Sequence, residues 1–183
     1  MSDQTVLTCA DINLDGLAEM LGRFGITLEV LPAGSPIAGS WFGEPEAGLL
    51  GRRLIVRPDT PVHSALHESC HLICIDEERR GRLHTNVDGD YDEENAVNYL
   101  EITLAGCLDD VGQGRILQDM DNWGYTFRLG SARAWFEQEA DDARAWLLKH
   151  AIIDTQGRPR WQFRQAPHRH APDGTFETAP GAR

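Results

Sequence analysis

Residues 65–74 read ALHESCHLIC and contain His67, Glu68 and His71 in the spacing H-E-x-x-H. Side chains four positions apart lie on one face of an α-helix, about 6 Å apart, so two imidazoles can bind one metal ion. Glu68 lies one position after His67, and its carboxylate can reach a water on that ion. Zinc lowers the pKa of its water and a carboxylate accepts the proton, so the motif indicates metal-assisted hydrolysis.

The motif lies within a segment, 60–80, that is predicted to be a helix. Thr60 can cap its N-terminus, and Pro61 in the first helical position loses no backbone hydrogen bond. Apolar residues flank the motif on both sides, namely Ala65, Leu66, Leu72 and Ile73. This composition indicates a helix that packs against a core, not a solvated helix that contains two histidines by coincidence.

A catalytic zinc site needs a third protein ligand, and acidic residues begin the helix predicted for 92–109. Glu93 shares a helix face with the apolar residues Val97, Leu100, Leu104 and Cys107. A carboxylate on a buried face is costly unless it has a partner, and a metal ion between the two helices would be one. We therefore predict Glu93 as the third ligand.

Two other interpretations of this helix start remain open. Glu94 shares a face with Asn98 and Glu101, a face that we interpret as solvent-exposed, yet a sequence defines helix phase only to within a residue or two. Glu94 is therefore the alternative ligand. Glu93 would have no ligand role if it formed a capping box with Asp90.

The order of strand, H-E-x-x-H helix, loop and glutamate-bearing helix resembles the gluzincin metallopeptidases. The stretches LHESCHLI and EENAVNYLEITL are similar to the two motifs of the ImmA/IrrE group of small intracellular zinc peptidases, and the similarity covers roughly residues 37–108. The resemblance implies a Zn²⁺ cofactor bound by His67, His71 and Glu93, and Glu68 as general base. It implies cleavage of a protein or peptide substrate in the cytoplasm.

Residues 69 and 70 depart from that group, which usually has small residues or glycine where this chain has Ser69 and Cys70. A second hypothesis is therefore a catalytically silent zinc-binding regulatory module of gluzincin descent. A third is a structural zinc site closed by a fourth ligand, either Cys70 or His63, which lies on the face of the two motif histidines.

Peptide hydrolysis also needs a donor that stabilises the oxyanion of the tetrahedral intermediate. The candidates are His84, Tyr91, Tyr99 and Tyr125. We favour Tyr91 or His84 because their loop joins the two predicted metal-bearing helices. The predicted catalytic residues are thus Glu68 and Tyr91.

The composition of the chain excludes some classes of protein. The chain has 183 residues, of which 41% are hydrophobic, and a net charge of −12. Such a charge repels phosphate backbones, so we expect no direct nucleic-acid partner. We expect no membrane span or signal peptide, because no apolar segment is long enough. The four cysteines form no C-x-x-C pair and are expected to be reduced, and the sequence does not indicate an oligomeric state.

The predicted fold is α+β: a small gluzincin-like domain, residues 1–155, with about three strands in an antiparallel or mixed sheet. The strands are expected at 26–31, 37–42 and 49–58. Helices are expected at 13–24, at the two metal-bearing segments, at 115–121 and from Ser131 onward. Residues 156–183 are rich in proline and glycine, and we predict an extended or disordered arm there.

Overall fold

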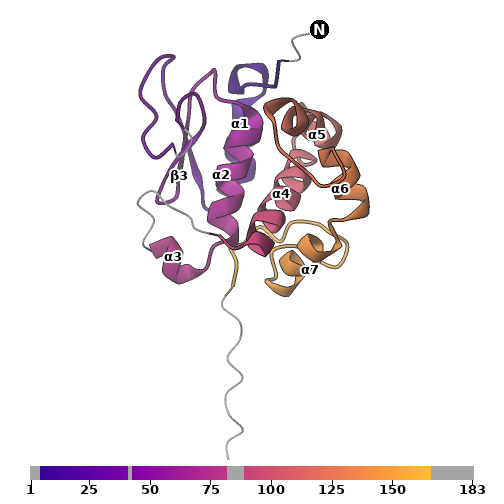
Figure 1. Ribbon diagram of the computed structural model, residues 1–183. Coiled ribbons are helices and arrows are strands. Elements are labelled where there is room, and N and C mark those ends of the chain that lie inside the picture. The colour runs from indigo at the N-terminus through magenta and orange to yellow at the C-terminus, as the bar shows by residue number, and fades with distance from the viewer. Residues whose placement is uncertain (1–4, 41–42, 82–88, 166–183) are drawn as a thin grey trace, which may run out of the picture.

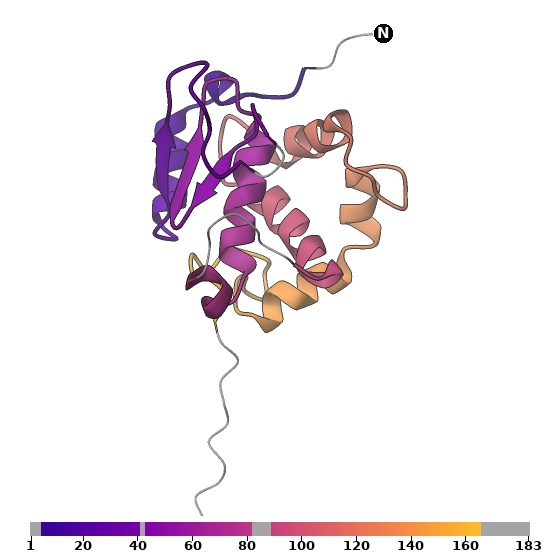
Figure 2. The same ribbon diagram turned by 60° about the vertical axis from the view of Figure 1, so that its left-hand side comes forward.

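The computed structural model describes residues 5–40, 43–81 and 89–165, and its architecture is α+β (Figure 1). A three-stranded sheet lies on one side of helix α2, and the helices that begin after residue 90 lie on the other, an arrangement that Figures 1 and 2 both show. Within these ranges no helix has both the length and the apolar character needed to traverse a bilayer.

The sheet is mixed, as expected, with strand order β1-β3-β2. Its strands are β1 (Thr27–Val30), β2 (Gly48–Leu50) and β3 (Arg53–Val56). β1 runs parallel to β3, and β2 runs antiparallel to β3. The single strand predicted for 49–58 is therefore a hairpin, which turns at Gly51 with a φ of 59° that favours glycine. In the described part of 37–42 there is one isolated bridge, from Ser40 to Gly48, and no strand.

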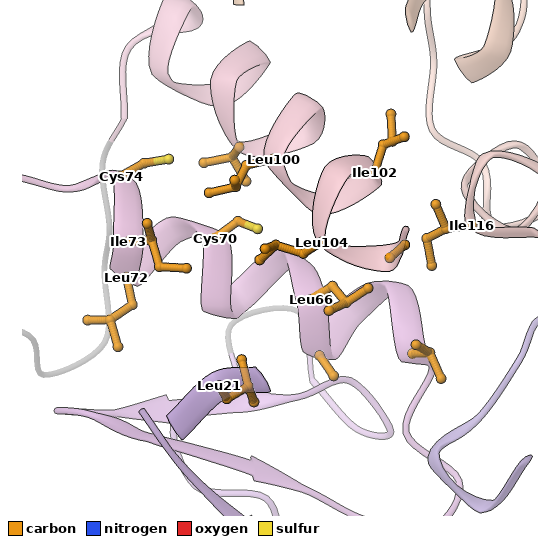
Figure 3. Close-up of a cluster of buried hydrophobic side chains, with 14 of the residues drawn as sticks. Leu21, Leu66, Cys70, Leu72, Ile73, Cys74, Leu100, Ile102, Leu104 and Ile116 are labelled. Carbon is orange, nitrogen blue, oxygen red and sulfur yellow. The ribbon is translucent and has the colours of Figure 1, made fainter. Parts of the chain in front are cut away.

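Helices α2 (Val62–Cys74) and α4 (Tyr91–Ala105) pack against each other and form the centre of the molecule. Their contact is apolar: Leu66 and Cys70 of α2 lie beside Leu100 and Leu104 of α4 (Figure 3), and all four are fully buried. α2 also packs against β2 and β3, while α1 (Leu14–Gly22) packs beside β1. The H-E-x-x-H motif thus lies on the most enclosed helix of the domain.

Three predicted helices begin or end at other residues than expected. Segment 60–80 divides at Ile75, whose extended backbone separates α2 from α3 (Glu77–Gly81). The helix expected from Ser131 also divides, into α6 (Ala132–Gln138) and α7 (Asp141–Lys149). The short helix predicted for 115–121 is longer, α5 (Gly112–Trp123), and a 3₁₀ turn, η1 (Cys9–Asp11), precedes α1.

The described part of the predicted arm packs against the domain. Trp161 lies 5.2 Å from the ring of Phe24, between centroids, and the guanidinium of Arg23 lies 3.5 Å from the Trp161 ring. The backbone N–H of Arg164 donates to the carbonyl of Ile73 at the end of α2. Residues 156–165 therefore cover the helix ends, and the rest of the predicted arm lies outside the described residues.

Candidate metal centre

Three side chains converge where α2 faces α4. Ring nitrogens of His67 and His71 and a carboxylate oxygen of Glu94 all lie within 4.8 Å of one another, and these residues could hold a metal ion. The Nε2 atoms of the two histidines are 3.0 Å apart. Nε2 of His71 is 3.8 Å from Oε1 of Glu94. The structure thus brings both motif histidines together with a carboxylate of the second helix.

This donor set fits a divalent transition metal. Two nitrogens on one tetrahedral zinc, each about 2.05 Å from the metal, are separated by roughly 3.3 Å. The observed 3.0 Å between the Nε2 atoms differs from that separation by a few tenths of an ångström. Imidazole and carboxylate suit zinc, and they also bind other first-row divalent ions, so the donors alone do not specify the metal.

Glu101 holds His67 in the orientation that such a site needs. Its Oε2 lies 3.2 Å from Nδ1 of His67, and the Glu101 side chain is fully buried. When Nδ1–H donates to this carboxylate, Nε2 keeps its lone pair and faces the site. Histidines that bind metals are commonly oriented by a carboxylate in this way. The sequence interpretation of Glu101 as solvent-exposed is therefore wrong.

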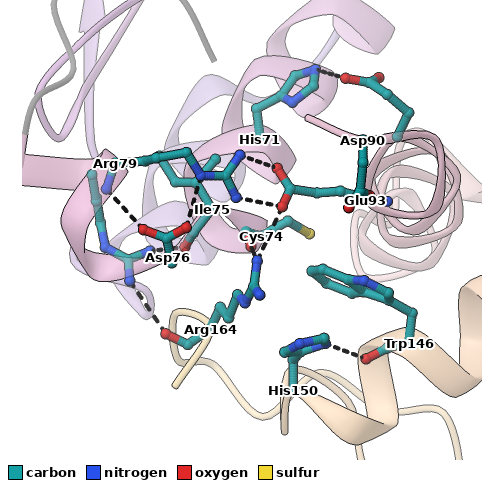
Figure 4. A network of polar contacts seen from close by, with 12 residues as sticks. His71, Cys74, Ile75, Asp76, Arg79, Asp90, Glu93, Trp146, His150 and Arg164 are labelled. Carbon is teal, nitrogen blue, oxygen red and sulfur yellow. Dashed lines mark hydrogen bonds and ion pairs between the residues drawn. The ribbon is translucent and has the colours of Figure 1, made fainter. Parts of the chain in front are cut away.

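Glu93, the predicted third ligand, has other partners and is replaced by Glu94 in the candidate site. Its two carboxylate oxygens accept from Arg79 at 2.9 and 2.5 Å, and Arg164 donates to it at 3.1 Å (Figure 4). Burial of Glu93 on the core face is as expected, with an exposed fraction of 3%. Two guanidinium groups compensate the burial of this carboxylate. Asp90 caps the helix by accepting from the Glu93 N–H.

The two motif histidines have opposite electrostatic environments. Burial lowers the pKa of His67, but the hydrogen bond to Glu101 and the charges of Glu101, Glu68 and Glu94 outweigh it, so the pKa lies above its ordinary value. Burial, with smaller effects of His67 and Arg79, lowers the pKa of His71 to about 3. A neutral His71 has a free lone pair, which metal binding requires.

Glu68, the predicted general base, is buried beside the metal candidates. Its exposed fraction is 7%. Burial raises the pKa of its carboxyl to about 7; the charge of His67 acts in the opposite direction, and Glu46 and Glu94 add to the increase. Glu68 thus interacts electrostatically with His67 and Glu94, two members of the candidate metal cluster. The H-E-x-x-H motif requires a general base near the metal ligands.

The predicted oxyanion donor, Tyr91, is 79% exposed at the first turn of α4. Tyr125 lies closer, with its ring centroid 5.9 Å from that of His67. Tyr99 packs on Phe136 instead, and His84 lies outside the described residues. Of the four candidates, the tyrosine that the structure brings beside the motif is therefore Tyr125.

His63 and Cys70 do not join the cluster. His63 is 1% exposed and packs against the rings of Trp123 and Tyr125, and neither of its ring nitrogens has a hydrogen-bond partner. Cys70 lies in the apolar contact between α2 and α4, and burial raises the pKa of its thiol well above the ordinary value. Among the described residues, the geometry gives no fourth protein ligand and thus no closed structural site.

A hollow of about 320 Å³ opens beside the cluster. It is lined by His67 and Glu94 of the cluster and by Glu46, Ser64, Asn98, Trp123, Gly124 and Tyr125. Two candidate metal ligands therefore form part of the wall of a cavity that a small group can enter. A site for catalysis, unlike a structural metal site, needs such access.

Sequence reasoning missed Glu101 and Glu46. Glu101 lies seven positions, or two helical turns, after Glu94, so the two share a face. The signal was the near-continuous apolar sequence around Glu101, because a helix that is apolar all round is buried on every side. Nothing in the sequence places Glu46 near the motif, since the turn that carries it is brought there by the sheet.

Comparison with known proteins gives no relative. No protein-family model, no curated protein and no solved structure matches the chain. The chemistry of the site therefore rests on its own residues.

Proposed function

We propose that the protein is a zinc-dependent metallopeptidase in which His67, His71 and Glu94 bind zinc and Glu68 is the general base. The observation that carries the proposal is the convergence of both motif histidines, on α2, with a carboxylate of α4. Zinc bound there would polarise the scissile carbonyl and lower the pKa of a water molecule.

The chain's own residues have separate tasks in this proposal. Glu68 accepts a proton from the attacking water and afterwards donates it to the amine nitrogen that leaves. Glu101 keeps His67 in the tautomer whose Nε2 faces the site. Tyr125 is the candidate donor to the oxyanion, since its ring lies beside His67 and lines the hollow. The choice of a peptide as substrate rests on the resemblance of the two motifs to gluzincins.

Metal analysis and peptide hydrolysis test the proposal together. The purified protein should contain about one zinc per chain and cleave members of a fluorogenic peptide library. Glu68→Gln should keep the zinc and lose hydrolysis, whereas His67→Ala should lose both. Glu77→Gln, which changes an exposed glutamate on α3, is the matched control and should alter neither.

Two outcomes would contradict the proposal in different ways. Protein that binds no zinc, even after reconstitution, would refute the metal site itself. Protein that holds zinc but cleaves no peptide would refute the enzyme and favour the silent zinc-binding module.

A further inference from the structure

The hollow beside the candidate metal centre has acidic and aromatic walls. Glu46 and Glu94 contribute carboxylates, and Trp123 and Tyr125 contribute rings. None of the residues that line it, all within the described ranges, is a lysine or an arginine. Glu94 has the two histidines and the proposed zinc as partners, so Glu46 is the carboxylate of this wall that has no ion-pair partner among the described residues.

Glu46 is held in place by neutral donors. The hydroxyl of Ser64 donates to its Oε2 at 3.4 Å, and the side chain of Trp123 also hydrogen-bonds to it. Ser64 is itself fixed, since its Oγ accepts from the backbone N–H of Ala47 at 3.0 Å. Over the described part of the chain, no cationic side chain forms an ion pair with Glu46, although the residue is half-buried.

Asn98 has an acceptor without a donor. It lies one helical turn after Glu94 on α4 and lines the same hollow. Its Oδ1 is buried and has no hydrogen-bond partner. Buried polar atoms are nearly always paired, and this oxygen is an exception. Because it is almost inaccessible to solvent, Asn98 lines the hollow with its other atoms.

We propose that this hollow binds a lysine or arginine side chain of the substrate, at a residue next to the scissile bond, and that Glu46 determines the preference. The inference rests on the proposed peptidase function. A cationic group has several N–H donors and can donate to the carboxylate of Glu46. Its aliphatic stem would pack along Trp123 and Tyr125, whose ring faces also attract cations.

The position of the hollow limits which substrate residue enters it. His67 and Glu94 belong both to the cavity wall and to the candidate metal set, so a side chain in the hollow belongs to a residue adjacent to the bond at the metal. The size, about 320 Å³, is at the low end for ligand cavities and suits one side chain.

A binding experiment tests the proposed preference for a basic side chain independently of peptide hydrolysis. The probes are fluorescent peptide pools with one fixed position, which holds lysine, norleucine (the uncharged side chain that lacks the ammonium group), or glutamate. They are titrated by anisotropy into zinc-loaded protein that carries Glu68→Gln, so that no probe is cleaved. We expect the lysine pool to bind about tenfold or more tightly than the norleucine pool. The ammonium group of lysine can form a charge-assisted hydrogen bond with Glu46, and norleucine has no such group. Adding Glu46→Gln should remove the difference, whereas adding Glu19→Gln, an exposed glutamate on α1, should not.

Hydrolysis by the otherwise unaltered chain gives the second readout. The products of a mixed peptide library should show lysine or arginine enriched next to the cleaved bond, and Glu46→Lys should shift the enrichment to acidic residues. Cleavage without a basic preference, or equal binding of the lysine and norleucine pools, would overturn the inference while leaving the peptidase proposal intact. Zinc-loaded protein that binds the lysine pool selectively but cleaves nothing would support the hollow and refute the peptidase.

Discussion

Neighbouring glutamates at the start of α4 are expected to respond oppositely to the same substitution. Glu93→Gln removes the charge that two guanidinium groups share, and Glu94→Gln removes a candidate metal ligand. The two side chains differ by one position on one helix, so the local effects on helix propensity and on the helix dipole are closely matched. The pair therefore tests whether Glu93 has a structural role and Glu94 a role in metal binding.

The expected decrease in the free energy of unfolding for Glu93→Gln follows from the contacts of the Glu93 side chain. The Glu93 side chain is 4% exposed, while those of Arg79 and Arg164 are 32% and 20% exposed. Breaking a buried ion pair by removing one partner costs about 3–5 kcal/mol. Because water screens the partly exposed arginines, we expect a cost at or below the lower end of that range, about 2–3 kcal/mol. For a domain of this size this corresponds to a Tm lower by roughly 5–10 °C.

The assay combines urea unfolding of chelator-treated protein with zinc titration. Glu93→Gln should lower the free energy of unfolding by the stated amount and keep its affinity for zinc. Glu94→Gln should leave the stability of the metal-free protein within about 0.5 kcal/mol of the starting protein and weaken zinc binding strongly. A Glu93→Gln protein that keeps its stability and loses zinc would refute this assignment and restore Glu93 as the ligand.

Three further measurements test other contacts. Glu101→Gln removes the carboxylate that orients His67 and should weaken zinc affinity about 10- to 100-fold in a competition titration with a chelator, while unchanged affinity would show that this contact does not support the site. Leu104→Ala opens a cavity between α2 and α4 and should cost about 2–5 kcal/mol in urea unfolding, and a loss below 1 kcal/mol would contradict the packing. The hydrogen bonds from Arg57 lower the pKa of Asp59 below its ordinary 3.8, so the pair stabilises the fold above about pH 4 and this contribution is lost as pH falls through the lowered pKa. The stability of Asp59→Asn should therefore fall less between pH 5 and pH 2 than that of the unaltered chain, and parallel acid profiles would contradict the pairing.

Sequence patterns predicted the order of the main elements well, because apolar periodicity and capping residues act locally. The residues at which the helices end were harder to predict. Ile75 is apolar and fits a continuing helix, yet α2 ends there and the Ile75 side chain is fully buried. Cys107 was expected on the buried stripe of α4, but the helix ends at Ala105 and Cys107 is exposed. In both cases tertiary packing, which a local pattern does not contain, determines where the helix ends.

The sequence predicted the two histidines of the candidate site, but it did not distinguish Glu93 from Glu94 as the third ligand. The burial of Glu93 was predicted correctly from its face, but its partners lie 14 and 71 positions away in the sequence. A buried carboxylate needs a positive partner, and sequence alone does not show whether that partner is a metal ion or a distant arginine. The role of Glu101 was missed for a related reason, since α4 is enclosed on several sides and has no clear solvent face.

The contact between Arg164 and Glu93 also has a consequence for the order of events during synthesis. Arg79 is translated before Glu93 and can pair with it as soon as α4 forms, whereas Arg164 follows Glu93 by 71 residues. At about 5–20 residues per second this interval is roughly 4–14 seconds. During that time the end of α2 and the start of α4 lack the segment that finally covers them, so Arg79 alone can pair with the buried Glu93 before the second arginine is made.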